Sequence, residues 1–198
     1  MTVRRVHRLL GLVLLLPICA WVVTGAIFFL KPGYAGAYEM LSVRARSLPA
    51  MRAASLPEGT MEARILRTAI GDHLLIRTAA GWLQRDPATM HVRPVPSPQE
   101  VRALVADAVR GKARYGDIAT VRGLTARTST GVAIDLDWST LSLSQRGPDT
   151  DRIDMFYRIH YLQWTGIKVL DRVLGGVGLV LMLALTLLGL RLAFGGRF

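Results

Sequence analysis

Residues 9–30 read LLGLVLLLPICAWVVTGAIFFL, a run of 22 residues without a charged side chain. As an α-helix this run would extend about 33 Å, enough to cross a hydrocarbon core of about 30 Å. Residues 173–190, VLGGVGLVLMLALTLLGL, form a second uncharged run of 18 residues near the other end of the chain. Neither run has the polar face that a core helix of a soluble protein shows. The sequence therefore predicts two transmembrane helices.

The charges beside the first apolar run predict its orientation. Arg4, Arg5 and Arg8 precede the run, whereas only Lys31 follows it closely. Basic residues accumulate on cytoplasmic flanks, so we expect the N-terminus in the cytoplasm. Two crossings return the C-terminus to that side and leave the central residues outside, in the periplasm if the cell is Gram-negative. The alternative reading of the first run is a cleaved signal peptide with a site at Ala35-Gly36-Ala37, although the apolar region of a signal is usually only about 7–15 residues long.

Composition narrows the function classes. The 198 residues carry a net charge of +11, and 51% of them are hydrophobic. The basic excess is spread along the chain, and no basic run is interleaved with aromatic residues, so nucleic acid is not an expected partner. The single cysteine excludes an internal disulfide and a cysteine-based zinc site. No nucleophile–base spacing and no phosphate-binding glycine loop is present, so we assign no catalytic residue.

The central residues predict a small α+β body. Residues 31–60 are rich in proline and glycine, which indicates a connector with a short helix near 39–46. Ser97-Pro98-Gln99-Glu100 is a capping-box pattern, and apolar residues follow it at helical spacing, so we expect a helix covering one face of a sheet. The expected strands, separated by turn residues, are 63–70, 73–79, 82–85, 90–95, 118–126, 132–138 and 140–144.

A fourth segment, residues 149–172, is expected to be an amphipathic helix with an aromatic face. Tyr157, Tyr161 and Trp164 on that face suit the membrane interface, where Tyr and Trp are enriched. Glycines of the second apolar run are expected to permit close helix packing; these are Gly175, Gly178 and Gly189.

The predicted fold class is thus a membrane α+β protein, in which two transmembrane helices flank a small periplasmic antiparallel sheet with a covering helix. The expected segments are 1–30 for the cytoplasmic flank and first transmembrane helix, 31–148 for the body, 149–172 for the interfacial helix, and 173–198 for the second transmembrane helix and cytoplasmic tail. In the body, we expect His73 and His91 to be surface or packing residues, and Asp135 and Asp137 to lie on a solvated sheet face.

Both membrane ends resemble the PepSY-associated transmembrane helix family. The first match is RVHR at residues 5–8, followed by Gly11 and by Thr24-Gly25. The stronger match is YRIHYLQWTG at residues 157–166, continuing through LDR at 170–172 to Gly175. The body, which contains DPAT at residues 86–89, is similar to a PepSY domain.

This resemblance implies a bacterial inner-membrane protein with a PepSY body in the periplasm. Larger relatives with four spans are associated with iron uptake, and some are haem-bearing reductases that pass electrons outward to ferric siderophores. Their axial ligands are histidines near helix ends, and the motif match transfers this expectation to His7 and His160 as ligands of haem b. Arg8 and Arg158 are the expected partners of the haem propionates. This chain departs from those relatives in having two spans.

Geometry restricts the haem hypothesis. His7 and His160 are expected at opposite faces of the bilayer, roughly 30 Å apart, so they cannot ligate one iron within a single chain. A symmetric homodimer would pair each histidine with its own copy, and another inner-membrane subunit is the alternative partner. Each histidine also has an ordinary reading, His7 as part of the basic flank and His160 as a hydrogen-bonding group at the headgroups. The alternative function is a non-catalytic, membrane-anchored periplasmic module that binds or regulates a partner protein.

Overall fold

The computed structural model describes residues 2–48 and 55–195. Its contacts divide the chain into two units. The first, here called the helical unit, comprises Met1–Tyr34 and Asp151–Phe198. The second, here called the α+β body, comprises Ala35–Thr150.

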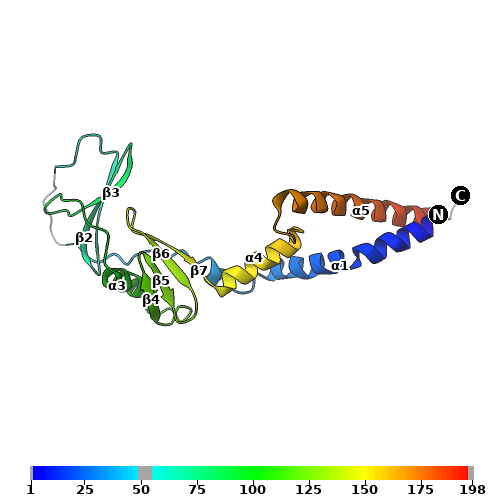
Figure 1. Ribbon diagram of the computed structural model, residues 1–198, viewed down its shortest axis with the longest axis horizontal. Coiled ribbons are helices and arrows are strands. Elements are labelled where there is room, and N and C mark those ends of the chain that lie inside the picture. Colours follow the sequence, from blue (N-terminus) through cyan, green and yellow to red (C-terminus); the bar gives the residue numbers. More distant parts are fainter. Residues whose placement is uncertain (1, 49–54, 196–198) are drawn as a thin grey trace. The chain divides into compact units, whose positions relative to one another are not determined.

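Two long helices dominate the helical unit. They are α1 (Val3–Leu30) and α5 (Lys168–Phe194), and both are long and apolar enough to cross a membrane, as the sequence predicts. They run antiparallel, side by side, with the start of α1 and the end of α5 at the same end of the pair (Figure 1). At that end the helices approach closely, because a Cβ atom added to Gly189 would lie 3.2 Å from His7 Cε1.

A third helix, α4 (Pro148–His160), starts at the boundary of the two units. The predicted helix over residues 149–172 is wrong in its second half, because α4 ends at His160 and α5 starts at Lys168. Leu162 and Gly166 take left-handed conformations, with φ values of 55° and 76°, which end the helix and turn the chain. Asp171 fixes this turn by accepting hydrogen bonds from the backbone N–H and the hydroxyl of Thr165, at 2.9 and 2.7 Å.

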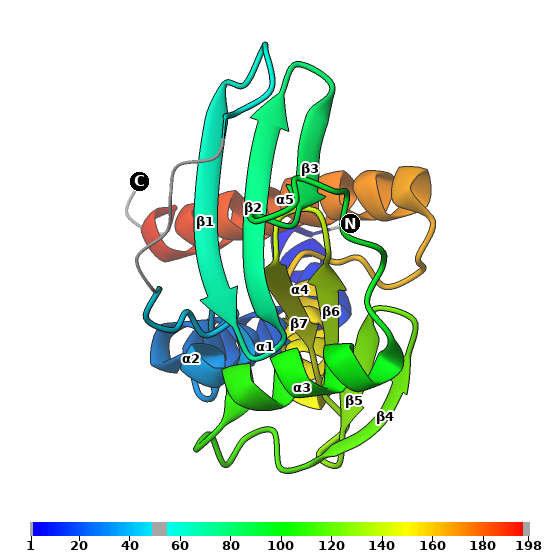
Figure 2. The ribbon, with the colours of Figure 1, turned by 90° about the vertical axis from the view of Figure 1, so that its left-hand side faces the viewer.

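The α+β body contains two antiparallel sheets, whereas the sequence predicts one. The three-stranded sheet has the order β1-β2-β3, and the four-stranded sheet has the order β4-β5-β6-β7. Figure 2 shows β1, β2 and β3 side by side, each joined to the next by a tight turn. The strands are β1 (Glu62–Thr68), β2 (Gly71–Thr78), β3 (Gly81–Arg85), β4 (Ile118–Arg122), β5 (Thr125–Thr128), β6 (Ala133–Asp137) and β7 (Ser142–Arg146).

Three further expectations for the body are corrected. The predicted strand 118–126 is the hairpin β4-β5, because Gly123, with a φ of 57°, allows a turn there. The predicted strand 90–95 is reduced to one bridge between Val92 and Arg85, since Pro94 and Pro96 cannot donate to a ladder. The predicted helix near 39–46 does not form, and the connector instead holds the short helix α2 (Tyr34–Ala37).

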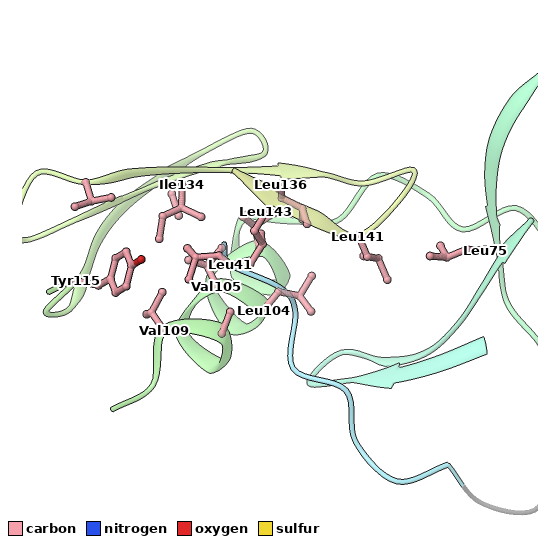
Figure 3. Close-up of a cluster of buried hydrophobic side chains, with 14 residues drawn as sticks. Leu41, Leu75, Leu104, Val105, Val109, Tyr115, Ile134, Leu136, Leu141 and Leu143 are labelled. Atoms are coloured by element: carbon pink, nitrogen blue, oxygen red, sulfur yellow. The ribbon is translucent and has the colours of Figure 1, made fainter. Parts of the chain in front are cut away.

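The covering helix α3 (Pro98–Val109) begins as predicted. Ser97 accepts a hydrogen bond from the backbone N–H of Glu100, whose carboxylate accepts the N–H of Ser97 in return. The face of α3 that carries Leu104 and Val105 packs against the four-stranded sheet, and Leu75 of β2 belongs to the same buried cluster (Figure 3). One hydrophobic core therefore serves both sheets.

A buried histidine connects the two sheets. His73 is fully buried, with its Nε2 2.8 Å from the Thr68 hydroxyl and its Nδ1 3.1 Å from Gln84 Oε1. The Gln84 amide then donates to the carbonyl of Trp138, beyond β6, at 2.5 Å. Burial lowers the pKa of His73 below its usual value. His73 is therefore a packing residue, one of the two roles that the sequence predicts for it.

A polar cluster, here called the clamp, closes the body where the chain enters and leaves it. Arg114 donates two hydrogen bonds to Asp149, at 3.0 and 2.6 Å, and one to Gln145 at 2.6 Å. The Tyr115 hydroxyl lies 2.9 Å from Gln145 Oε1 and 3.0 Å from Glu39 Oε2, so these two acceptors share its one proton. Burial, followed by the Glu39 carboxylate, raises the pKa of Tyr115 to about 12. Residues on both sides of the body thus meet in one network.

Candidate functional site

An apolar pocket of about 400 Å³ lies within the helical unit. This size falls in the usual range of small-molecule sites, about 300–1,000 Å³. Three stretches of chain contribute to its walls: α1, the segment at the end of α4, and α5. The lining residues are Leu14, Pro17, Trp21, His160, Tyr161, Leu162, Trp164, Leu174, Gly175, Gly178, Leu179 and Met182. This space is here called the His160 pocket.

The register of the two long helices explains why the pocket forms there. His7 lies beside Gly189, and a Cβ atom added to Gly11 would lie 3.9 Å from the Leu185 side chain, so the helices are in contact at one end. Continuing the same antiparallel register brings Trp21 level with Gly175. At that level the segment after α4 also lines the space, and a Cβ atom added to Gly175 would meet nothing within 4 Å. Because glycine has no side chain, Gly175 leaves space for the pocket.

His160 is the histidine on the pocket wall, and aromatic rings pack around it. The Trp21 ring stacks against the imidazole with centroids 5.4 Å apart. Phe28 and Tyr161 meet it edge-on at 5.0 and 5.5 Å. Such packing restricts the side-chain rotamer, so the imidazole position is preorganised.

A single hydrogen bond selects the tautomer of His160. The Thr24 Oγ1 lies 2.9 Å from His160 Nδ1. The hydroxyl has one proton, and that proton is used on the carbonyl of Ala20, four residues earlier in α1, at 2.7 Å. Thr24 therefore accepts from Nδ1–H, and the neutral imidazole keeps a free lone pair on Nε2. Among the described residues, no hydrogen bond to Nε2 is found. An imidazole with this arrangement is suited to ligate a metal or to accept a proton.

His7 lies at the other end of the helix pair. Its Nδ1 is buried and, within residues 2–48 and 55–195, has no hydrogen-bond partner. Along α1, 17 residues separate His7 from Thr24, the residue that contacts His160. At 1.5 Å per residue this corresponds to about 25 Å. The two histidines thus occupy opposite ends of the unit, and no atom can bridge them within one chain.

The other expected site residues differ in whether they lie at the His160 pocket. Tyr157 stacks on Phe28 with ring centroids 4.5 Å apart, and Tyr161 and Trp164 are exposed at the edge of the His160 pocket. Arg8 is exposed on the first turns of α1. Arg158 is exposed and lines two neighbouring pockets but not the His160 pocket.

The three glycines expected to pack helices differ in what they touch. Gly189 lies against His7, as noted. Gly178 faces the Leu162 side chain, 3.3 Å from an added Cβ atom, rather than α1. Gly175 has open space beside it and forms part of the pocket. Two of the three therefore border the His160 pocket.

The α+β body has a pocket of about 480 Å³ at the end of α3, and none of its described lining residues is a histidine. In the parts of the chain that the structure describes, three or more His, Cys, Asp or Glu side chains nowhere gather as a metal site. Asp135 and Asp137 are exposed and accept hydrogen bonds from Thr125 and Ser139. The His160 pocket is therefore the site that we carry forward.

From the sequence, Trp21 was not expected at the candidate site, and Thr24 was named only as part of the family resemblance. They lie on one helical face with Gly25 and Phe28, at spacings of three, four and seven residues from Trp21. The available signal was the position of one small polar residue, Thr24, and two aromatic residues, Trp21 and Phe28, on one face of an otherwise aliphatic helix. Comparison of the chain with protein-family models, curated proteins and solved structures gives no match.

Proposed function

We propose that this chain is a PepSY-type inner-membrane protein that takes part in iron acquisition by passing electrons through haem b to a ferric substrate outside. Two helices long and apolar enough to span a bilayer support the membrane part of the proposal. Only 11% of the most apolar stretch of α1 and none of that of α5 is buried. Surfaces of this kind need a lipid bilayer or another protein to cover them.

The observation that carries the haem proposal is the hydrogen bond between Thr24 and His160. It leaves Nε2 as the free nitrogen, and neutral imidazole nitrogen is a common axial ligand of haem iron. The apolar walls and the missing side chain at Gly175 fit a flat, largely apolar macrocycle. When bound, haem would supply one-electron transfer, and the chain would supply the ligand, a fixed imidazole orientation and apolar walls.

One chain provides one histidine at this level of the membrane. A second axial ligand would come from His160 of a second copy, and two-fold symmetry makes such self-pairing natural. His7 would pair in the same way at the opposite end of the helices. The two levels would then give electrons a route across the bilayer.

The test is the absorption spectrum of the full chain, expressed with haem supplied and purified in detergent. We expect a Soret band that is reduced in His160→Ala, lost in the His7→Ala, His160→Ala double variant, and retained in His91→Ala, a histidine exposed on the α+β body. Thr24→Val should retain haem with an altered spectrum, because the tautomer is no longer fixed. A wild-type protein without a Soret band would disprove the redox proposal.

The second candidate function is a non-catalytic membrane-anchored module that binds or regulates a partner. The observation that favours it is the body itself, which has its own hydrophobic core and a closed polar clamp. Crosslinking in membranes would then recover a different protein, with no chromophore bound to this one.

A further inference from the structure

A cationic pocket adjoins the His160 pocket, and the haem proposal does not use it. It has a volume of about 520 Å³ and includes Arg158, Lys168 and Arg172. These three side chains make no ion pair within 4 Å among the described residues. Asp171, the one acid in the lining, is buried and its Oδ1 already accepts two hydrogen bonds from Thr165. The pocket therefore has an excess of positive charge.

An apolar groove of about 480 Å³ lies next to the cationic pocket. The two share Arg158 and Gln163, so the groove begins where the charged pocket ends. Its other lining residues are Leu16, Ala20, Met155, Ile159 and Trp164. From Arg158, the groove extends past Ala20 to Leu16, toward the middle of α1.

We propose that these two pockets bind one anionic phospholipid, with its phosphate at the three basic side chains and an acyl chain in the groove. A phosphodiester carries the negative charge that the pocket lacks, and a guanidinium can donate two parallel hydrogen bonds to it. The groove supplies apolar surface in the direction that an acyl chain takes from a headgroup into the bilayer. Charge and apolar surface thus match the two ends of one molecule.

The position of the basic residues along the chain agrees with headgroup depth. Lys168 and Arg172 lie in the first turns of α5, and Arg158 lies in the last turn of α4. Basic side chains at the ends of membrane helices reach the interface, where phosphates lie. This inference rests on the membrane part of the proposed function and not on haem. It also assigns Arg158 to a lipid phosphate instead of a propionate.

Native mass spectrometry of the full chain in detergent tests the proposal. The protein is offered an equimolar mixture of phosphatidylglycerol and phosphatidylcholine with identical acyl chains. We expect the bound lipid to be predominantly phosphatidylglycerol. One basic residue near a lipid surface corresponds to about fivefold in affinity, so Arg158→Gln should reduce this preference about fivefold.

Arg152→Gln is the matched control, because Arg152 is another exposed arginine of α4 that lines neither pocket. Its preference should stay within about twofold of the wild type. Equal binding of the two lipids, or equal losses in both variants, would overturn the proposal. Displacement of the lipid by millimolar inorganic phosphate would identify a free anion as the occupant and would overturn it as well.

The same samples separate this inference from the haem proposal. The Soret absorbance of each preparation reports haem, whereas the mass of each adduct reports lipid. Circular dichroism of Arg158→Gln with wild-type helix content shows that any lost preference reflects the side chain. A chain that leaves membranes in alkaline carbonate would refute the membrane proposal, and this inference with it.

Discussion

Arg114→Ala should destabilise the α+β body strongly, because Arg114 is the centre of the clamp. The substitution removes two hydrogen bonds to the Asp149 carboxylate and one to Gln145. The Arg114 and Asp149 side chains are 18% and 23% exposed, so the pair is neither fully buried nor freely solvated. An exposed pair contributes about 0–1 kcal/mol, and breaking a buried pair costs about 3–5 kcal/mol. We expect a loss of about 2–3 kcal/mol in the free energy of unfolding.

Urea unfolding of the full chain in detergent measures this loss. With Trp21 and Trp164 replaced by Phe, the fluorescence comes from Trp82 and Trp138, which both belong to the body. Arg127→Ala is the control, because Arg127 is exposed on the outer face of β5. Its effect should stay within about 0.5 kcal/mol.

A double-mutant cycle identifies the source of the effect. If Arg114 acts through Asp149, the cycle of Arg114→Ala with Asp149→Ala gives a coupling energy above about 0.5 kcal/mol. A smaller coupling energy, or an Arg114→Ala loss no larger than that of Arg127→Ala, would refute the clamp as a stabilising element.

Three further predictions concern pH, helix packing and topology. The pKa of His73 is lowered in the folded state, so the unfolded chain gains the proton first, and the free energy of unfolding should fall as the pH drops below about 6.5. His73→Gln should remove this pH dependence in urea titrations at several pH values. An unchanged pH dependence would contradict the assignment. Gly189→Leu should separate α1 from α5, since even a Cβ atom would lie 3.2 Å from His7; a distance label pair on the two helices should report the change, with Gly176→Leu, which has open space, as the control. A reporter fused to the C-terminus should be active in the cytoplasm, and activity on the outside would refute the hairpin topology.

Local signals in the sequence predicted local structure well. The capping box at Ser97 and Glu100 set the start of α3 within a residue, because both partners lie in one turn. The two long apolar helices followed from length and composition alone. Signals of this kind need no knowledge of the rest of the fold.

Expectations that depended on distant contacts were less successful. Glu39 was expected to lie at the start of a short helix. Its carboxylate instead accepts a hydrogen bond from the hydroxyl of Tyr115, which lies 76 residues further along the chain. The division into two sheets depends on how the strands pack around α3, which alternation along the chain does not encode. Apolar alternation across residues 118–126 predicted a single strand. The positive φ of Gly123 instead divides that stretch into two strands.

The candidate site shows the same difference between local signals and distant contacts. The aromatic face around His160 was predictable from spacing within one segment. The residue that selects its tautomer, Thr24, lies 136 residues away and in a different helix. The sequence therefore predicted the aromatic setting of His160 but not the hydrogen bond that leaves its Nε2 free.

The clamp also gives a physical reason why the body can be inserted in the chain between the two long apolar helices α1 and α5. Gln145 donates to the carbonyls of Gly36 and Glu39, at 3.3 and 2.6 Å, and the Thr150 hydroxyl donates to the carbonyl of Ala37 at 3.4 Å. The chain thus leaves the body within hydrogen-bonding distance of where it enters. A domain with adjacent ends can be inserted without forcing its neighbours apart. Loss of the clamp would free those ends to separate, so Arg114→Ala should weaken the body without requiring α1 and α5 to lose their contact.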